Sequence, residues 1–151
     1  MKTIKISTYP LKLKSFDGQK LVFDQIRQKY VVFTPEEFVR QNMISYLIHE
    51  KKYRKNLMAV EYSVKHMNTV LRSDIVVFDK ELQPIIIIEC KAPKVRISQS
   101  TIDQAVVYNG HLKVKYLIVS NGNVTYCCKM DYINNSYDFI QNIPDFEAIS
   151  H

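Results

Sequence analysis

The chain has 151 residues, a formal net charge of +6 and 46% hydrophobic residues, which is enough for the core of one domain. No apolar run is long enough to span a membrane, and the polar start of the chain lacks the apolar stretch of a signal peptide. We therefore expect a soluble, cytoplasmic protein. The three cysteines are too few and wrongly spaced for a zinc site or a disulfide framework.

The sequence divides into an N-terminal extension over 1–33, a core over 34–131 and a polar C-terminal tail over 132–151 within one domain. In the extension, the pattern predicts a strand or arm that includes 11–16, followed by a short helix over about 19–29. The tail carries scattered aromatic residues, and we expect it to wrap the surface or fray.

A helix is predicted from Thr34 to about His49. Thr34-Pro35-Glu36-Glu37 is a capping box with proline at the first helical position, and apolar residues follow at helical spacing. A second helix is predicted over about 101–109, because Ser100-x-x-Asp103 is a further capping pattern and Gly110 follows.

Strands are predicted near 57–64, 73–78 and 85–91 between the two helices, and near 115–120 and 123–130 after the second helix. Asn121-Gly122 joins the last two strands and is typical of a tight hairpin turn. The predicted order from Thr34 onward is αβββαβ, with one further hairpin strand. Parallel pairing of the strand after the second helix would satisfy the usual crossover rules.

Three charged residues occupy distinctive positions in the central hairpin. Asp74 opens one apolar strand, and Glu89 and Lys91 close the next, in the spacing D-x14-E-x-K. If the strands pair about Glu81 and Leu82, Asp74 lies next to Glu89, and Glu89 and Lys91 point to the same side. Two such carboxylates suit Mg²⁺, which would acidify a bound water and stabilise charge on a phosphate. Lys91 would orient that water or stabilise the phosphate.

A simpler interpretation is that Asp74 begins an exposed hairpin and that Glu89 and Lys91 form a surface ion pair of little energetic value. The strand before Glu89 argues against it. Residues 85–88 are four consecutive isoleucines, which is typical of a strand buried on both faces. A charge pair that ends such a strand emerges at the rim of a core.

These residues resemble the PD-(D/E)xK phosphodiesterase superfamily, and within it the N-terminal nuclease domain of type I restriction enzyme R subunits. Ser73-Asp74 stands where the superfamily signature has Pro-Asp. The resemblance extends over about 34–131 and is carried by Pro35-Glu36-Glu37-Phe38-Val39-Arg40, Arg72-Ser73-Asp74-Ile75-Val76, Ile88-Glu89-Cys90-Lys91-Ala92-Pro93, Gln104 with Tyr108, and Asn121-Gly122. It implies a restriction-endonuclease-like α/β fold, whose αβββαβ core has a central mixed sheet flanked by helices.

The resemblance also implies roles for further residues. A glutamate of the first helix often completes the metal shell in such nucleases, and Glu37 matches it, although Glu37 could instead only reach back to the Thr34 amide. Glu61, in the strand over 57–64, is a lesser candidate. Gln104 and Tyr108 match a Q-x3-Y motif that contributes to nucleic-acid binding. Their spacing of four places them on one helix face, where Tyr108 could instead fill the core.

The basic residues favour a polyanionic partner, since phosphate contacts from lysine and arginine are largely independent of base sequence. Lys94 and Arg96 directly follow the candidate catalytic strand, so we predict that both contact nucleic acid. A second cluster follows the first helix and could equally be a solvated loop; it comprises Lys51, Lys52, Arg54 and Lys55.

The sequence thus predicts a Mg²⁺-dependent DNA endonuclease, with Mn²⁺ as a possible substitute metal. Asp74, Glu89 and Lys91 are the predicted catalytic residues, and Asp74, Glu89 and Glu37 the predicted metal ligands. With three glycines the chain has no phosphate-binding loop, so a translocase or specificity subunit would be a separate partner. The alternatives are a non-catalytic nucleic-acid-binding or assembly module, and RNA as the substrate.

Overall fold

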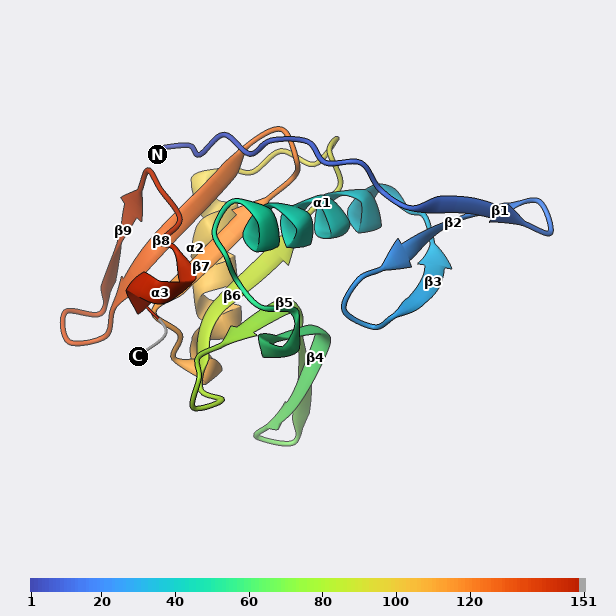
Figure 1. The fold of residues 1–151 in the computed structure, drawn as a ribbon. Coiled ribbons are helices and arrows are strands. Elements are labelled where there is room, and N and C mark those ends of the chain that lie inside the picture. Colours follow the sequence, from blue (N-terminus) through green and yellow to red (C-terminus); the bar gives the residue numbers. More distant parts are fainter. Residues whose placement is uncertain (150–151) are drawn as a thin grey trace.

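The computed structural model describes residues 1–149, which form a mixed α/β fold with two sheets and three α-helices (Figure 1). The N-terminal sheet has the order β1-β2-β3, and its strands are β1 (Leu13–Phe16), β2 (Gln19–Asp24) and β3 (Lys29–Val32). This small antiparallel sheet projects away from the rest of the molecule in Figure 1.

The main sheet has six strands in the order β4-β5-β6-β7-β8-β9. They are β4 (Met58–His66), β5 (Thr69–Phe78), β6 (Pro84–Cys90), β7 (Tyr116–Ser120), β8 (Thr125–Asp131) and β9 (Ser136–Ile140). Only β6 and β7 pair in parallel, and the connection between them contains α2 (Gln99–Asn109). The predicted hairpins and the predicted parallel pair are therefore confirmed.

The two long helices cover opposite faces of the main sheet (Figure 1). Residues Val39, Met43 and Leu47 of α1 (Pro35–His49) pack with Ile86 and Ile88 of β6. Ile102 and Ala105 of α2 pack with Ile87 on the other side. All four isoleucines of β6 are at most 3% exposed, which confirms a strand buried on both faces. Within residues 1–149, no helix is long and apolar enough to cross a membrane.

Thr34 caps α1 as predicted, since its Oγ1 accepts a hydrogen bond from the Glu37 backbone N–H at 3.0 Å. The predicted cap of the second helix is wrong by two residues. Ser98, rather than Ser100, caps α2, and it does so in a capping box with Thr101, so the helix begins at Gln99. Two short 3₁₀ helices, Lys55–Leu57 and Gly110–Leu112, follow the loop after α1 and the end of α2.

The predicted helix over about 19–29 is wrong, because this segment forms β2, a turn and the start of β3. The preceding Asp17-Gly18 pair has positive φ values of 52° and 79°, the conformation of a tight hairpin turn, and it joins β1 to β2. Within β2 the side chains of Val22 and Asp24 alternate onto the buried face, with exposed fractions of 0%.

The C-terminal tail does not fray over the residues that the structure describes. Its strand β9 extends the main sheet by pairing with β8, and α3 (Phe146–Ile149) buries Phe146 against Tyr53, with ring centroids 5.6 Å apart. The apolar residues Ile143, Phe146 and Ile149 join the core beneath α1. The predicted tail residues 150 and 151 lie outside the described part of the chain.

Candidate active site

The pairing of β5 with β6 brings Asp74 and Glu89 together. Ile75 lies opposite Ile88, so the next position along each strand is Asp74 and Glu89. Both line a cavity of about 20 Å³, together with Ser73 and Asn109. The Cys90 backbone N–H donates a hydrogen bond to Asp74 Oδ2 at 2.7 Å, which fixes one oxygen of this carboxylate against the end of β6.

Lys91 directly follows β6 and lies beside Glu89. Its Nζ is 3.5 Å from Glu89 Oε1, and its backbone N–H donates to the Ser120 carbonyl oxygen at 2.8 Å. The side chains of Asp74, Glu89 and Lys91 are 26%, 25% and 33% exposed, respectively. All three side chains thus lie at the rim of the core and remain accessible to solvent. A bound ion with water ligands would need this access.

A buried arginine lies among three carboxylates. Arg40 of α1 is 5% exposed, and its Nη2 lies 3.8 Å from Asp74 Oδ1 and 3.5 Å from Glu61 Oε1. Its Nη1 is 3.6 Å from Glu37 Oε1. The Nε and Nη1 atoms of Arg40 are buried without a hydrogen-bond partner among the described residues. Arg40 therefore neutralises carboxylates mainly through its charge.

Glu37 is held by nitrogen donors in this arrangement. Its Oε2 accepts a hydrogen bond from Gln41 Nε2 at 3.0 Å, and its Oε1 lies 3.4 Å from Arg27 Nη2. The side chain does not cap the helix, because the Thr34 N–H donates to the Val32 carbonyl oxygen. Within residues 1–149, no three His, Cys, Asp or Glu side chains are grouped closely enough to hold a metal ion together. Glu37 as a metal ligand stays a prediction.

Glu61 of β4 lies opposite Asp74 of the neighbouring strand β5, and its backbone conformation is unusual. Its φ of 53° falls in the left-handed region, and the pairing of β4 with β5 skips Glu61 and Asp74. The side-chain alternation of β5 is also interrupted here, since Ser73 donates a hydrogen bond to Asn109 of α2 while Ile75 packs beneath α1. The irregularity lets Asp74 face Arg40.

Arg27 and Asp24 are members of this cluster that the sequence analysis missed. Arg27 lies in the β2–β3 loop, with Nη1 3.5 Å from Glu61 Oε2 and Nε 2.5 Å from Asp24 Oδ2. Asp24 is fully buried, and its Oδ1 accepts hydrogen bonds from the backbone N–H groups of Ile26 and Arg27. The available signal was the charged residue Asp24, which shares the buried face of β2 with the apolar Val22. This signal was missed because the segment was predicted to be a helix.

The Asp24 carboxylate makes the stability of the protein depend on pH. Burial acts to raise the pKa of Asp24, but hydrogen bonds from the Arg27 backbone and guanidinium outweigh it, so the pKa lies below its ordinary value. A lowered folded-state pKa gives stability that is present above the unfolded-state pKa of about 3.9 and lost as the pH falls through the folded-state value.

We expect Asp24→Asn to lower the free energy of unfolding by about 1.5–3 kcal/mol at pH 7, the usual contribution of a hydrogen bond to a charged group. The gap between the two proteins should narrow as the pH falls below about 4. Urea unfolding at pH 7 and pH 3 measures both quantities. A gap that stays constant over this range would show that the ionised carboxylate contributes no stability.

Comparison with known proteins places the chain in a family. Residues 35–144 match the family described as type I restriction enzyme R protein N terminus (HSDR_N). The chain belongs to this family. A search of curated proteins gave no significant match. A solved fragment of "a putative HsdR subunit of a type I restriction enzyme" from Vibrio vulnificus YJ016 is similar, with 18% identity and a TM-score of 0.46. The similar region covers 69% of this chain and 22% of that one.

The HSDR_N region contains the four residues predicted to bind nucleic acid. Tyr108 is 42% exposed, and its hydroxyl accepts a hydrogen bond from the Arg72 N–H at 3.0 Å, so it does not fill the core. Gln104, Lys94 and Arg96 are exposed. The loop that carries Lys94 and Arg96 is tied to the β7–β8 turn, because Asn121 Nδ2 donates to the Val95 carbonyl oxygen at 2.8 Å. Their contact with nucleic acid stays a prediction.

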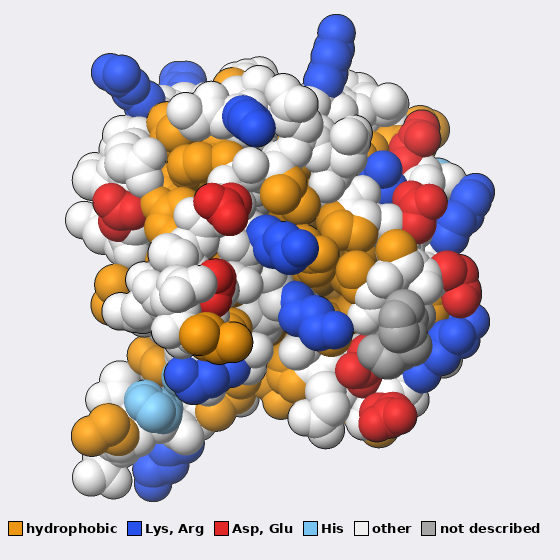
Figure 2. All heavy atoms as spheres, turned by 90° about the vertical axis from the view of Figure 1, so that its left-hand side faces the viewer, with side chains coloured by type: hydrophobic (Ala, Val, Ile, Leu, Met, Phe, Trp, Pro, Cys, Tyr) orange, Lys and Arg blue, Asp and Glu red, His pale blue; other side chains and the backbone are white. Residues whose placement is uncertain are grey.

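Two of the four basic residues after α1 form ion pairs with the C-terminal segment. Lys51 pairs with Asp145, and Arg54 pairs with Glu147 of α3. Figure 2 shows the side of the molecule on which α3 lies, and there acidic and basic side chains are intermixed with apolar ones. Such a mixed face offers a polyanion little net attraction.

Proposed function

We propose that this HSDR_N domain is a Mg²⁺-dependent endonuclease that hydrolyses phosphodiester bonds of DNA. The observation that carries the proposal is the junction of β5 and β6, where Asp74, held at 2.7 Å by the Cys90 N–H, adjoins Glu89 and its neighbour Lys91. Two partly exposed carboxylates and a lysine lie together at the rim of the core. Such a cluster of charges is not needed to stabilise the fold, which favours a functional role.

The donor set fits magnesium. Asp74 and Glu89 offer hard carboxylate oxygens on one small cavity, and Mg²⁺ is commonly held by one or two carboxylates while it keeps several waters. When bound, Mg²⁺, or Mn²⁺ in its place, would acidify a water and neutralise charge on the phosphate. Glu37 would join these ligands only after exchanging its contacts with Arg27, Arg40 and Gln41.

Each protein group has a separate task in this proposal. Asp74 and Glu89 hold the metal, and the Cys90 N–H fixes the orientation of Asp74. Lys91 places a positive charge on the same side as Glu89, where it orients the attacking water or stabilises the phosphate in the transition state. Gln104 and Tyr108 on α2, with Lys94 and Arg96 after β6, contact the substrate backbone.

The competing proposal is a non-catalytic nucleic-acid-binding or assembly module, and a third is RNA cleavage. Family membership favours a restriction context, in which DNA, a translocase and a specificity subunit are the partners we propose. The arrangement of Asp74, Glu89 and Lys91 favours catalysis, since a pure binder gains nothing from two carboxylates that repel a phosphate.

Side-by-side incubation with supercoiled plasmid, single-stranded DNA and RNA separates these functions. We expect Mg²⁺ and Mn²⁺ to support nicking of the plasmid, and EDTA to abolish it. Cleavage restricted to RNA would contradict the DNA assignment. Binding of all three without cleavage in either metal would favour the non-catalytic module.

A further inference from the structure

The N-terminal sheet lies outside the region that matches the family and yet is firmly attached to the candidate active site. It spans residues 13–32, whereas the family match begins at residue 35. Beyond the contacts of Arg27 with Glu37 and Glu61, Gln25 Nε2 donates to Ser45 Oγ of α1 at 3.0 Å. The sheet therefore has a fixed orientation relative to Asp74.

The charge of this sheet is strongly positive. Residues 11–33 contain five cationic side chains and two acidic ones, and one of the acids, Asp24, is buried against Arg27. The four lysines, Lys12, Lys14, Lys20 and Lys29, are exposed, and none forms an ion pair with residues 1–149. Exposed lysines that form no ion pair are free to attract an anionic partner.

Two of the lysines are pre-ordered by aromatic rings. Lys14 Nζ lies 4.0 Å from the centroid of the Tyr30 ring, and Lys12 Nζ lies 4.9 Å from that of Phe23. The two rings pack edge to face, with centroids 5.3 Å apart. Because cation–π contacts restrict the long lysine side chains, less conformational entropy is lost when their ammonium groups bind a phosphate.

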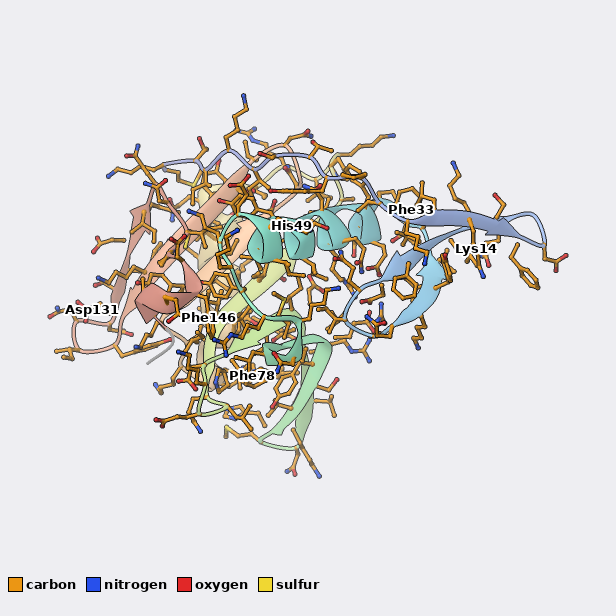
Figure 3. All side chains as sticks on the ribbon, in the orientation of Figure 1. Lys14, Phe33, His49, Phe78, Asp131 and Phe146 are labelled. Carbon is orange, nitrogen blue, oxygen red and sulfur yellow. The ribbon has the colours of Figure 1, made fainter. Side chains whose placement is uncertain are left out.

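We propose that the N-terminal sheet is an arm that binds the phosphate backbone of duplex DNA next to the candidate active site. The choice of DNA rests on the proposed function, whereas the binding surface rests on the lysines themselves. Figure 3 shows Lys14 on the projecting sheet and Phe33 where the sheet meets α1. A duplex held by the arm would be anchored at a second place, beyond the loop of Lys94 and Arg96.

Duplex binding is favoured over stacking on single-stranded bases. Stacking needs open aromatic faces, but Phe23 and Tyr30 are only partly exposed and carry the lysine ammonium groups. Phe16, at the β1–β2 turn, is the one aromatic residue of β1–β3 that is mainly exposed, at 69%. The arm thus offers charges for phosphates rather than a platform for bases.

The test compares two triple variants of the full chain by fluorescence anisotropy with a labelled duplex in EDTA, where cleavage cannot interfere. The arm variant carries Lys12→Gln, Lys14→Gln and Lys20→Gln. The control variant carries Lys113→Gln, Lys115→Gln and Lys129→Gln, three exposed lysines of which Lys113 also lies over an aromatic ring, that of Tyr132. Lys129 lies on β8, which ends at Asp131, at the end of the molecule away from Lys14 in Figure 3.

The arm variant should raise the Kd for duplex DNA about tenfold or more and reduce the slope of log K against log salt by about 3, or about 1 for each phosphate that the arm no longer neutralises. The control variant should change neither value appreciably, and Lys12→Arg with Lys14→Arg should bind like the parent. Equal weakening by both triple variants, or no weakening by the arm variant, would overturn the proposal. So would a loss of binding confined to single-stranded DNA.

The result of this binding test can be distinguished from the result of the nuclease test. An arm-dependent affinity in a protein that cuts no substrate would support the arm and count against the proposed catalysis. An unaltered thermal midpoint in the arm variant confirms that binding, rather than folding, has changed.

Discussion

Lys91→Met is expected to slow Mg²⁺-dependent nicking of plasmid DNA by about 10²- to 10⁴-fold, the range for loss of a positioned acid–base group. Methionine keeps most of the length of the side chain but removes the charge beside Glu89. Lys91 is one-third exposed and its backbone N–H is retained, so the fold should persist. The initial nicking rate at saturating Mg²⁺ measures the effect.

Lys80→Met is the matched control. Lys80 lies in the turn between β5 and β6, at the opposite end of the hairpin from Lys91, and pairs with the exposed Glu147. We expect this variant to nick DNA at nearly the parental rate. A Lys91→Met protein that nicks as fast as the parent would remove Lys91 from the catalytic group.

Arg40→Met is expected to lower the free energy of unfolding by about 3–5 kcal/mol, because it removes one of the two arginines that balance the buried charge of Glu37. The affected groups are Glu37, Glu61 and Asp74, of which Glu37 is 7% exposed. For a chain of this length, such a loss corresponds to a fall in Tm of roughly 6–20 °C. Urea unfolding and thermal scans in EDTA measure the change.

Magnesium should then stabilise the variant more than the parent. If Arg40 neutralises Asp74 in the absence of metal, a bound divalent cation can supply that charge instead, and ligand binding raises the apparent stability of the folded state. The control is Arg54→Met, since Arg54 is half-exposed and its pair with Glu147 should contribute about 1 kcal/mol or less. A loss of stability in Arg40→Met no larger than in Arg54→Met would show that the cluster does not need Arg40.

The local parts of the site could be predicted from the sequence. The isoleucine run of β6, the turn between β5 and β6 and the spacing of Asp74 and Glu89 are enough to bring the two acids together. The cap at Thr34 likewise depends on residues within one turn of the helix. Each of these features rests on side-chain periodicity or turn chemistry, which short segments encode.

The surroundings of the site depend on contacts between distant segments. Arg27 reaches Glu61 across 34 positions of the chain, and nothing in the sequence near either residue indicates the contact. The left-handed backbone of Glu61 arises where β4 pairs with β5, and it allows Asp74 to face Arg40. The short strand β9 forms because β8 offers it an edge to pair with.

The misassigned helix over about 19–29 has a related cause. The segment contains good helix formers, but β1 and β3 pair with it on both sides, and tertiary pairing overrides local propensity. The Asp17-Gly18 turn was the local signal that favoured a hairpin. Correct assignment of this turn would have placed Asp24 on the buried face of a strand. A buried carboxylate there would in turn have indicated a cationic partner, which is Arg27.

The most direct test of the proposed active site is the nicking of supercoiled plasmid by the parent and by Asp74→Asn, with Mn²⁺ binding measured on the same samples. Asparagine preserves the shape of Asp74 and can still accept the Cys90 N–H, but it removes the charge that would hold the metal. We predict that the parent binds Mn²⁺ and nicks the plasmid, and that Asp74→Asn does neither. Equal nicking and equal Mn²⁺ binding by the two proteins would contradict the assignment of the active site.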